Sequence, residues 1–374
     1  MRARKLFLIS ALAGLAIFGS PRTSRSTPPL PSTDSPAAAA PKVALLVTKP
    51  GAMNTSLYAA SPSDTAPPAP LATLTHLAGA TVRGAVIPGT TTLVATADTT
   101  ESRDLSFNAG LYRVAPHAPP ELLCDGVVHA SRPLVTPDGR VLVSRGKPGP
   151  EPKSARLADL RVDALTIDEV DPYTGMIRTV HTASGYLAFL AGSYGREVIV
   201  YRVFPGGADV IGVDVDTSEE RTLVGSLPPF ARDFSVDATT GTLVYQGRHE
   251  TDPHEWVIDR VDLVTLAHDR LAFSSSMNMV PFAVPGGAIT YSPEGRGGLT
   301  ILGEKAGNPF GEGADWVLSA SEDGESLAGL HTVQGKLGVP FVIDVPTGRG
   351  ALLRAPEGSR VAVAGFFPAG GGAL

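Results

Sequence analysis

The sequence predicts an all-β protein built from small antiparallel sheets that repeat along the chain. The 374 residues include 41 glycines and 33 prolines, which is too many for a helical protein because both residues interrupt helices. From Lys42 onward, short runs rich in Val, Leu, Ile, Tyr and Thr alternate with Gly, Pro, Asp and Asn, which is the pattern of strands and turns. These runs recur in a fixed order, as they do in repeat architectures.

The predicted strands are short and carry the β-branched and aromatic residues that favour sheets. Hydrophobic residues make up 43% of the chain, so the strands have enough apolar surface to form a core. Examples are Val43–Thr48, Thr92–Ala97, Arg140–Ser144, Val198–Phe204, Thr242–Gln246, Ala288–Tyr291 and Phe341–Val345.

The clearest repeated pattern begins at Pro133. Residues 133–136 are predicted to form a strand, residues 137–140 (Pro-Asp-Gly-Arg) a tight turn, and residues 141–145 the returning strand. Gly139 supplies the positive φ that such a turn requires. The same strand-turn-strand pattern recurs at residues 234–245, 281–291 and 317–324.

A second pattern follows the first. It is a strand that ends near an aspartate, then a turn, then a strand that ends near a leucine. It occurs at Ile211–Asp216 with Thr222–Val224, at Val261–Leu263 with Arg270–Phe273, at Phe341–Asp344 with Ala351–Leu353, and more loosely at Leu111–Arg113 with Glu121–Leu123. The two patterns together make four strands in about 35–55 residues, which is the size of a β-propeller blade.

The second pattern occurs near residues 58, 112, 167, 213, 262, 300 and 343, which predicts about seven blades. The unit at residues 277–313 is short, so six and eight blades are alternatives. Val43–Thr48 reads as the second strand of a blade and Val361–Pro368 as the first strand of one. We therefore expect the C-terminal strand to join the N-terminal blade, which closes the ring and removes exposed sheet edges. Two β-sandwiches are an alternative, but residues 42–374 contain no linker-like segment.

At residues 137–140 the sequence resembles TolB-like and WD-repeat-like propellers. In the TolB-like family a Ser-Pro-Asp-Gly type of turn joins the first two strands of a blade. The resemblance implies a single β-propeller over residues 42–374. TolB-like relatives act as envelope scaffolds and carry an additional N-terminal α/β domain. A proline-rich segment stands in that place here, so that particular role does not transfer.

The N-terminal segment is predicted to be a targeting signal. Arg2, Arg4 and Lys5 precede an apolar run at Leu6–Phe18, which has the length of a signal-peptide core and is short for a membrane span. Residues 1–20 are therefore interpreted as a signal peptide or an uncleaved anchor. Residues 21–41 contain six prolines among Ser, Thr and Ala, and are predicted to be a disordered linker. A periplasmic or extracellular location follows from this interpretation.

Charge and cysteine content exclude several kinds of function. The net charge is −6, and residues 1–41 hold five basic side chains against Asp34 alone, so the remainder is more acidic still. Nucleic acid is not an expected partner because its binding requires basic patches. No membrane span is expected beyond the N-terminal segment. Cys124 is the only cysteine and is predicted to be a buried bystander at a strand end.

Three local motifs resemble functional sites, but each lacks a residue that its chemistry requires. His249–Glu255 holds two His and three carboxylates, but Pro253 and the five-residue His spacing exclude the helical zinc motif. Asp214–Glu219 lacks the glycine and the distal acid of a calcium loop. Gly324–Ala328 lacks the final glycine of a nucleophile elbow. The glycine-rich stretches 295–298 and 311–313 fit no phosphate loop, and Trp256 and Trp316 are expected to pack between blades.

No catalytic, cofactor-binding or metal-binding residue is assigned from the sequence, and any cofactor stays unknown. Fold alone does not define a function. The leading hypothesis is a non-enzymatic scaffold that binds a protein or small ligand at one face of the propeller. The alternative is a lactonase-type hydrolase or a lyase with a metal in the central channel, because such sites gather ligands from several blades. A structural, surface-attached role comes third.

Overall fold

The computed structural model describes residues 41–99, 107–148, 162–228, 230–252, 254–293, 299–301, 304–305 and 309–368. The regular elements in these ranges are β-strands, in agreement with the predicted all-β class. The predicted targeting segment 1–20 and the predicted linker up to residue 40 lie outside the described residues. The chain divides into residues 1–38 and residues 39–374, and every strand belongs to the second unit.

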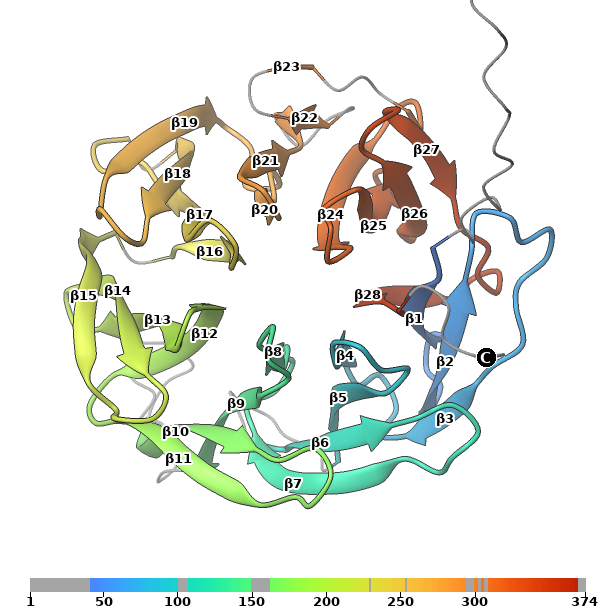
Figure 1. The fold of residues 1–374 in the computed structure, drawn as a ribbon, viewed down its shortest axis with the longest axis horizontal. Coiled ribbons are helices and arrows are strands. Elements are labelled where there is room, and N and C mark those ends of the chain that lie inside the picture. Colours follow the sequence, from blue (N-terminus) through green and yellow to red (C-terminus); the bar gives the residue numbers. More distant parts are fainter. Residues whose placement is uncertain are drawn as a thin grey trace, which may run out of the picture. The chain divides into compact units, whose positions relative to one another are not determined.

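Within this second unit the described strands form six antiparallel sheets, five with four strands and one with eight (Figure 1). The first sheet contains both ends of the strand series, in the order β28-β1-β2-β3. Its members are β1 (Val43–Thr48), β2 (Asn54–Ala60), β3 (Ala72–Thr75) and β28 (Arg360–Phe366).

The eight-stranded sheet consists of two four-stranded groups. The first group is β4 (Arg83–Val86), β5 (Leu93–Asp98), β6 (Ala109–Val114) and β7 (Glu121–Val127). The second is β8 (Leu134–Val135), β9 (Val141–Pro148), β10 (Val162–Val170) and β11 (Ile177–Ala183). The groups are joined through β7 and β9 by a single residue pair, Val127 with Arg145.

The four remaining sheets follow chain order. They are β12 (Leu187–Tyr194), β13 (Glu197–Phe204), β14 (Gly207–Asp214) and β15 (Glu220–Leu227); then β16 (Arg232–Asp237), β17 (Thr242–Arg248), β18 (Trp256–Asp262) and β19 (His268–Ser274); then β20 (Phe282–Val284), β21 (Ala288–Tyr291), β22 (Thr300–Ile301) and β23 (Glu304–Lys305); and last β24 (Ala314–Ala320), β25 (Ser326–Thr332), β26 (Val339–Asp344) and β27 (Arg349–Leu352). Each of the seven positions that the second sequence pattern marked lies in one of the described strands.

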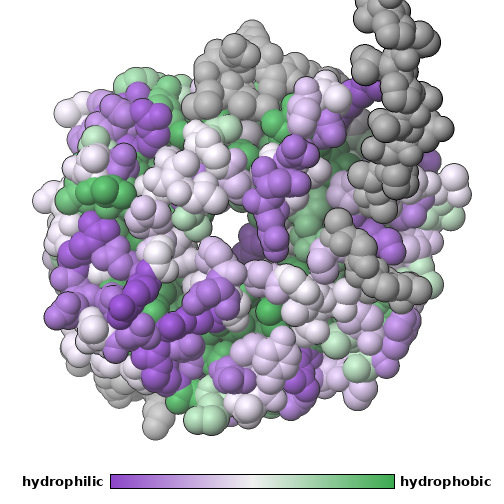
Figure 2. All heavy atoms as spheres, viewed as in Figure 1, coloured by the Kyte–Doolittle hydropathy of each residue, from purple (hydrophilic) through white to green (hydrophobic). Residues whose placement is uncertain are grey.

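The sheets stand around a central opening, as in a propeller, and not as two stacked sandwiches (Figure 1). The strands nearest the opening are β28, β4, β8, β12, β16, β20 and β24, and each of them contacts the next one around the opening. The opening is also visible between the atoms, with hydrophilic residues beside it (Figure 2). Hydrophobic clusters fill the space between neighbouring sheets; one of them joins Ile199 of β13 to Leu243 of β17.

The two ends of the strand series pair with each other. Strand β28 runs antiparallel to β1, with Val43 opposite Phe366 and Thr48 opposite Arg360. Residues 43–46 are at most 2% exposed, so this pairing lies in the core of the unit.

The predicted turn at residues 137–140 is also confirmed. Gly139 has a φ of 86° and donates its N–H to the carbonyl of Thr136 over 2.9 Å. The Thr136 hydroxyl accepts the N–H of Arg140 over 2.9 Å. The side chain of Thr136, directly before the turn, therefore closes it.

Candidate functional site

Arginines gather where the innermost strands begin. Arg83, Arg232 and Arg360 are the first residues of β4, β16 and β28, and Arg132 lies two residues before β8. The sheets are antiparallel with four strands each, and a short loop leads from each outermost strand to the next innermost strand. The innermost strands therefore begin at one end of the opening, which we call the channel mouth.

Arg132 extends across the channel mouth. Its Nε donates to the carbonyl of Gly84 in β4 over 3.3 Å, and its Nη1 donates to the carbonyl of Leu318 in β24 over 3.1 Å. Strand β24 does not neighbour β8 around the opening, so a side chain that begins beside β8 and ends at β24 must pass through the channel. The sequence separation of 186 residues explains why no local motif reveals this contact.

Burial among the inner strands, with Arg83 close by, lowers the pKa of Arg132 to about 10. Desolvation also lowers the pKa of Arg83. Both groups keep their charge near neutral pH, because arginine remains protonated far above it. Both side chains are nevertheless exposed to water that enters the channel. The protein thus holds two like charges near each other at the channel mouth.

Three of the four arginines have no acidic partner. Among the described residues, no ion pair involves Arg83, Arg132 or Arg360. The fourth, Arg232, pairs with Asp233 over 2.7 Å. Asp233 has a φ of 53° at an irregular point of β16, and burial raises the pKa of its carboxyl although Arg232 opposes this.

A second carboxylate at the start of an innermost strand, Asp315, is buried and bonded within its own sheet. Asp315 of β24 is fully buried and lies 2.7 Å from Nδ1 of His331. Burial raises the pKa of this carboxyl, and the imidazole opposes that change. Asp315 is bonded inside its own sheet and forms no pair with the channel arginines.

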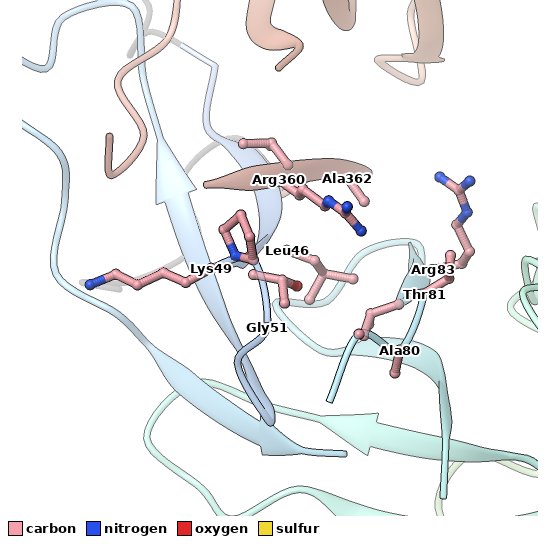
Figure 3. Close-up of a pocket in the computed structure, with 13 residues that line it drawn as sticks. Leu46, Lys49, Gly51, Ala80, Thr81, Arg83, Arg360 and Ala362 are labelled. Atoms are coloured by element: carbon pink, nitrogen blue, oxygen red, sulfur yellow. The ribbon is translucent and has the colours of Figure 1, made fainter. Parts of the chain in front are cut away.

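A pocket of about 250 Å³ opens beside two of the unpaired arginines, between β1, β28 and the residues before β4. Figure 3 shows Lys49 extending away on one side, whereas the guanidinium of Arg360 points toward the side where Arg83 lies. Apolar side chains complete the wall. The lining residues are Leu46, Thr48, Lys49, Pro50, Gly51, Gly79, Ala80, Thr81, Val82, Arg83, Arg360, Val361 and Ala362.

The chemistry of this arrangement is recognition of negative charge. A guanidinium presents N–H groups in a planar fork that matches carboxylate and phosphate oxygens. Cations lining a cleft with protein walls also concentrate anions by focusing the field. The lining of the pocket includes three cationic side chains and no acidic one.

The motifs weighed in the sequence lie elsewhere. The loop with His249 and Glu255 joins β17 to β18, and Nδ1 of His249 lies 3.2 Å from the Thr251 hydroxyl; Pro253 is outside the described residues. In the described part of the chain, no group of three His, Cys, Asp or Glu side chains is placed to hold a metal ion. Nor do these residues include a helix able to cross a membrane.

Two of the other motifs are turns, as expected. Asp214 Oδ1 accepts the backbone N–H groups of Asp216 and Thr217, each over 2.9 Å, so its oxygen caps the turn after β14. Gly324 donates its N–H to the carbonyl of Ser321 in the turn before β25. Of the glycine-rich stretches, residues 294–298 lie outside the described ranges.

Cys124 is buried as predicted but lies inside β7, not at a strand end. The error arose because Asp125 and Gly126 read as a turn; instead Gly126, with a φ of 72°, continues an irregular strand. Burial raises the pKa of the thiol to about 11, which leaves it unreactive. Trp316 of β24 donates its indole N–H over 3.1 Å to the carbonyl of Asn278, which lies in the loop between β19 and β20.

Sequence reasoning missed the channel arginines. Each stands alone among turn residues, and they come together only because β4, β8 and β28 surround one opening. A signal was nevertheless available. Arg83, Arg132, Arg232 and Arg360 occupy similar places in the repeated pattern, at or just before the first strand of a unit, and an alignment of the repeats with one another would have shown it.

The comparisons with known proteins place the chain in the β-propeller class of folds. No family model matches the sequence, and no curated protein matches it. Among solved structures, TolB from Acinetobacter baumannii is similar with a TM-score of 0.52 and 14% identity, over 87% of this chain and 67% of that one. One of two prolyl endopeptidases is similar with a TM-score of 0.52 and 14% identity, over 87% of this chain and 51% of that one, so this chain spans about half its length. At these identities the similarity concerns the fold alone.

Proposed function

We propose that this chain is a seven-bladed, closed β-propeller that serves as a non-enzymatic binding scaffold. Its ligand is a small anion or the acidic segment of a partner protein, bound at the channel mouth. The observation that carries the proposal is the set of three unpaired arginines, Arg83, Arg132 and Arg360, at one end of the opening.

Three features support the blade count and the closure. The eight-stranded sheet divides naturally into β4–β7 and β8–β11, because only the pair Val127–Arg145 joins them. With that division, each innermost strand begins a four-stranded group, and the seven innermost strands contact one another in an unbroken cycle. Strand β28 then completes the group of β1, β2 and β3 and leaves no open edge between the two ends.

Energetics support a binding role for the arginines. Like charges held near each other reduce the stability of the folded state, and no carboxylate of the described residues offsets this by pairing with them. A bound anion would supply the missing partner. Arginines on the other strands differ, because they pair with carboxylates. Arg202 of β13, for example, pairs with Asp209.

Binding of hexaglutamate to the full chain, measured by isothermal titration calorimetry at low salt, tests the proposal. We expect saturable binding that weakens about tenfold or more in Arg132→Met, because charge-assisted hydrogen bonds contribute about 1.5–3 kcal/mol. Arg196→Met is the matched control, since Arg196 is an exposed arginine that pairs with Asp214 and Asp216 away from the mouth. The proposal is wrong if hexaglutamate fails to saturate, or if the control loses as much affinity as Arg132→Met.

We also propose that residues 42–374 act outside the cytoplasm, after export directed by residues 1–20 and with residues 21–41 as a linker. The basic start and the apolar run at Leu6–Phe18 support this. Cell fractionation of the full chain, with N-terminal sequencing of the product, tests it. A product that begins between residues 20 and 42 in the exported fraction agrees with the proposal, whereas full-length protein confined to the cytoplasm contradicts it.

A further inference from the structure

A second pocket, separate from the channel mouth, lies between the sheet of β12–β15 and the sheet of β16–β19. Its volume is about 210 Å³, below the roughly 300–1,000 Å³ of pockets for drug-sized ligands, so it suits a ligand the size of one sugar ring. Its lining combines apolar and polar residues. The lining residues are Val224, Gly225, Ser226, Leu227, Pro228, Ala231, Tyr245, Gly247, Arg248, Glu250, Asp259 and His268.

A strained aromatic residue, Phe230, directly precedes Ala231 in the chain, and Ala231 lines this pocket. Phe230 is 62% exposed and has a φ of 83°, a backbone conformation that a bulky side chain rarely adopts. The Tyr201 hydroxyl holds it there by accepting the N–H of Phe230 over 3.1 Å and the N–H of Ala231 over 3.2 Å. Both the strained backbone of Phe230 and the exposure of its apolar ring to water reduce the stability of the folded state. Backbone strain of this kind concentrates at functional sites.

The wall of the pocket carries a second feature that reduces stability. The Tyr245 ring is fully buried against Phe234, yet its hydroxyl has no hydrogen-bond partner among the described residues. A buried hydroxyl without a partner is costly, and a phenylalanine at this position would pack equally well without that cost. Two residues that stability alone does not favour therefore adjoin one small pocket.

The polar groups of the pocket are already balanced in charge. Arg270 bonds Glu250 over 2.6 and 3.0 Å, and it bonds Asp259 over 2.9 Å. The guanidinium carbon of Arg248 lies 5.9 Å from the centre of the Phe230 ring and 4.9 Å from that of Trp256. The carboxylates can still accept hydrogen bonds through their remaining lone pairs, and the Tyr245 hydroxyl can donate. The pocket thus favours a neutral ligand with adjacent donors and acceptors.

We propose that this pocket binds a neutral, polyhydroxylated ring, that is, one monosaccharide unit. Phe230 covers the apolar face of the ring, and the hydroxyl groups bond to Glu250, Asp259 and Tyr245. A small adjustment at the rim opens the Tyr245 hydroxyl to the ligand. This site is independent of the channel mouth. Its ligand is neutral, whereas the ligand proposed for the channel mouth is an anion.

Saturation-transfer NMR on the full chain, with D-glucose, D-galactose, D-mannose and N-acetyl-D-glucosamine as probes, tests this inference. We expect at least one sugar to bind saturably, and to bind roughly tenfold more weakly in Phe230→Gly, because contact with an aromatic ring is lost. Glycine adopts the same φ without strain, so this variant should be at least as stable as the wild type. Tyr245→Phe should likewise weaken binding without loss of stability.

The matched control is Tyr173→Ala, which removes an aromatic residue that is 56% exposed and lies between β10 and β11, in another sheet. Its affinity for the sugar should equal that of the wild type. The inference is overturned if no sugar saturates, if Phe230→Gly binds as well as the wild type, or if that variant is less stable. Tighter binding of nicotinamide or glutamate at the same residues would overturn the proposed ligand class.

Discussion

Arginines at the channel mouth and arginines on the outer strands differ in whether a carboxylate pairs with them. On the outer strands, Arg145 bonds Asp168 over 2.8 Å and Arg221 bonds Glu197 over 2.6 Å, so each charge is matched within its own sheet. At the mouth, Arg83 and Arg132 are near each other without a carboxylate partner. The paired arginines stabilise the fold within their sheets, and we propose that the unpaired arginines at the channel mouth bind a ligand.

The largest effect is expected from breaking a buried pair on the outer strands. Arg145→Met leaves the Asp168 carboxylate, whose side chain is 3% exposed, without its cation. We expect a loss of about 3 kcal/mol in the free energy of unfolding, measured by guanidinium chloride denaturation at pH 7. Combining it with Asp168→Asn should recover part of the loss. A loss below about 1 kcal/mol in the single variant would contradict the structural role of the pair.

A smaller change in stability is expected at the mouth. Arg132→Met loses two hydrogen bonds to carbonyl groups but relieves the repulsion from Arg83. These effects oppose each other, so we expect the free energy of unfolding to stay within about 1 kcal/mol of the wild type. The same denaturation experiment measures it. A loss as large as that of Arg145→Met would mean that Arg132 mainly stabilises the fold.

The paired arginines also predict a dependence on pH. Arg270 bonds Glu250 and lowers the pKa of its carboxyl to about 2, from an ordinary value of 4.5. Because the folded-state pKa is depressed, the pair stabilises the protein above pH 4.5 and loses that contribution as the pH falls toward 2. The Glu250 side chain is half exposed, so the effect is only about 0.5 kcal/mol.

Comparing Glu250→Gln with the wild type by urea denaturation across this range measures the effect. The variant should be less stable at pH 7 and equal to the wild type near pH 2. A difference that stays constant with pH would show that the ionised pair contributes nothing.

The smallest effect is expected for an exposed pair. Arg196 is 63% exposed and contacts Asp214 and Asp216 in a turn. Arg196→Met should change the free energy of unfolding by less than about 0.5 kcal/mol, because surface ion pairs contribute little. Adding 0.5 M sodium chloride should reduce even this difference. A loss above 1 kcal/mol in the free energy of unfolding would contradict the expectation that exposed pairs contribute less than buried pairs.

The sequence predicted the fold far better than the site, for a physical reason. Strands and turns are local, so residues 133–145 sufficed to predict β8, the turn at Gly139 and β9. The pairing of β28 with β1 was predictable because an unfinished blade at each end needs a partner. The channel mouth is not local, since Arg132 and Leu318 meet only after all the sheets are in place. The strain at Phe230 and the unpartnered Tyr245 hydroxyl are equally invisible without coordinates.

The most direct test is the free energy of unfolding of a triple variant with Arg83→Met, Arg132→Met and Arg360→Met, measured at low salt with and without hexaglutamate. We expect the variant to be at least as stable as the wild type in the absence of the peptide. Hexaglutamate should then stabilise the wild type alone, because only that protein binds it in the folded state. A variant that loses several kcal/mol, or that hexaglutamate stabilises as much as the wild type, would contradict the claim that these arginines serve a ligand.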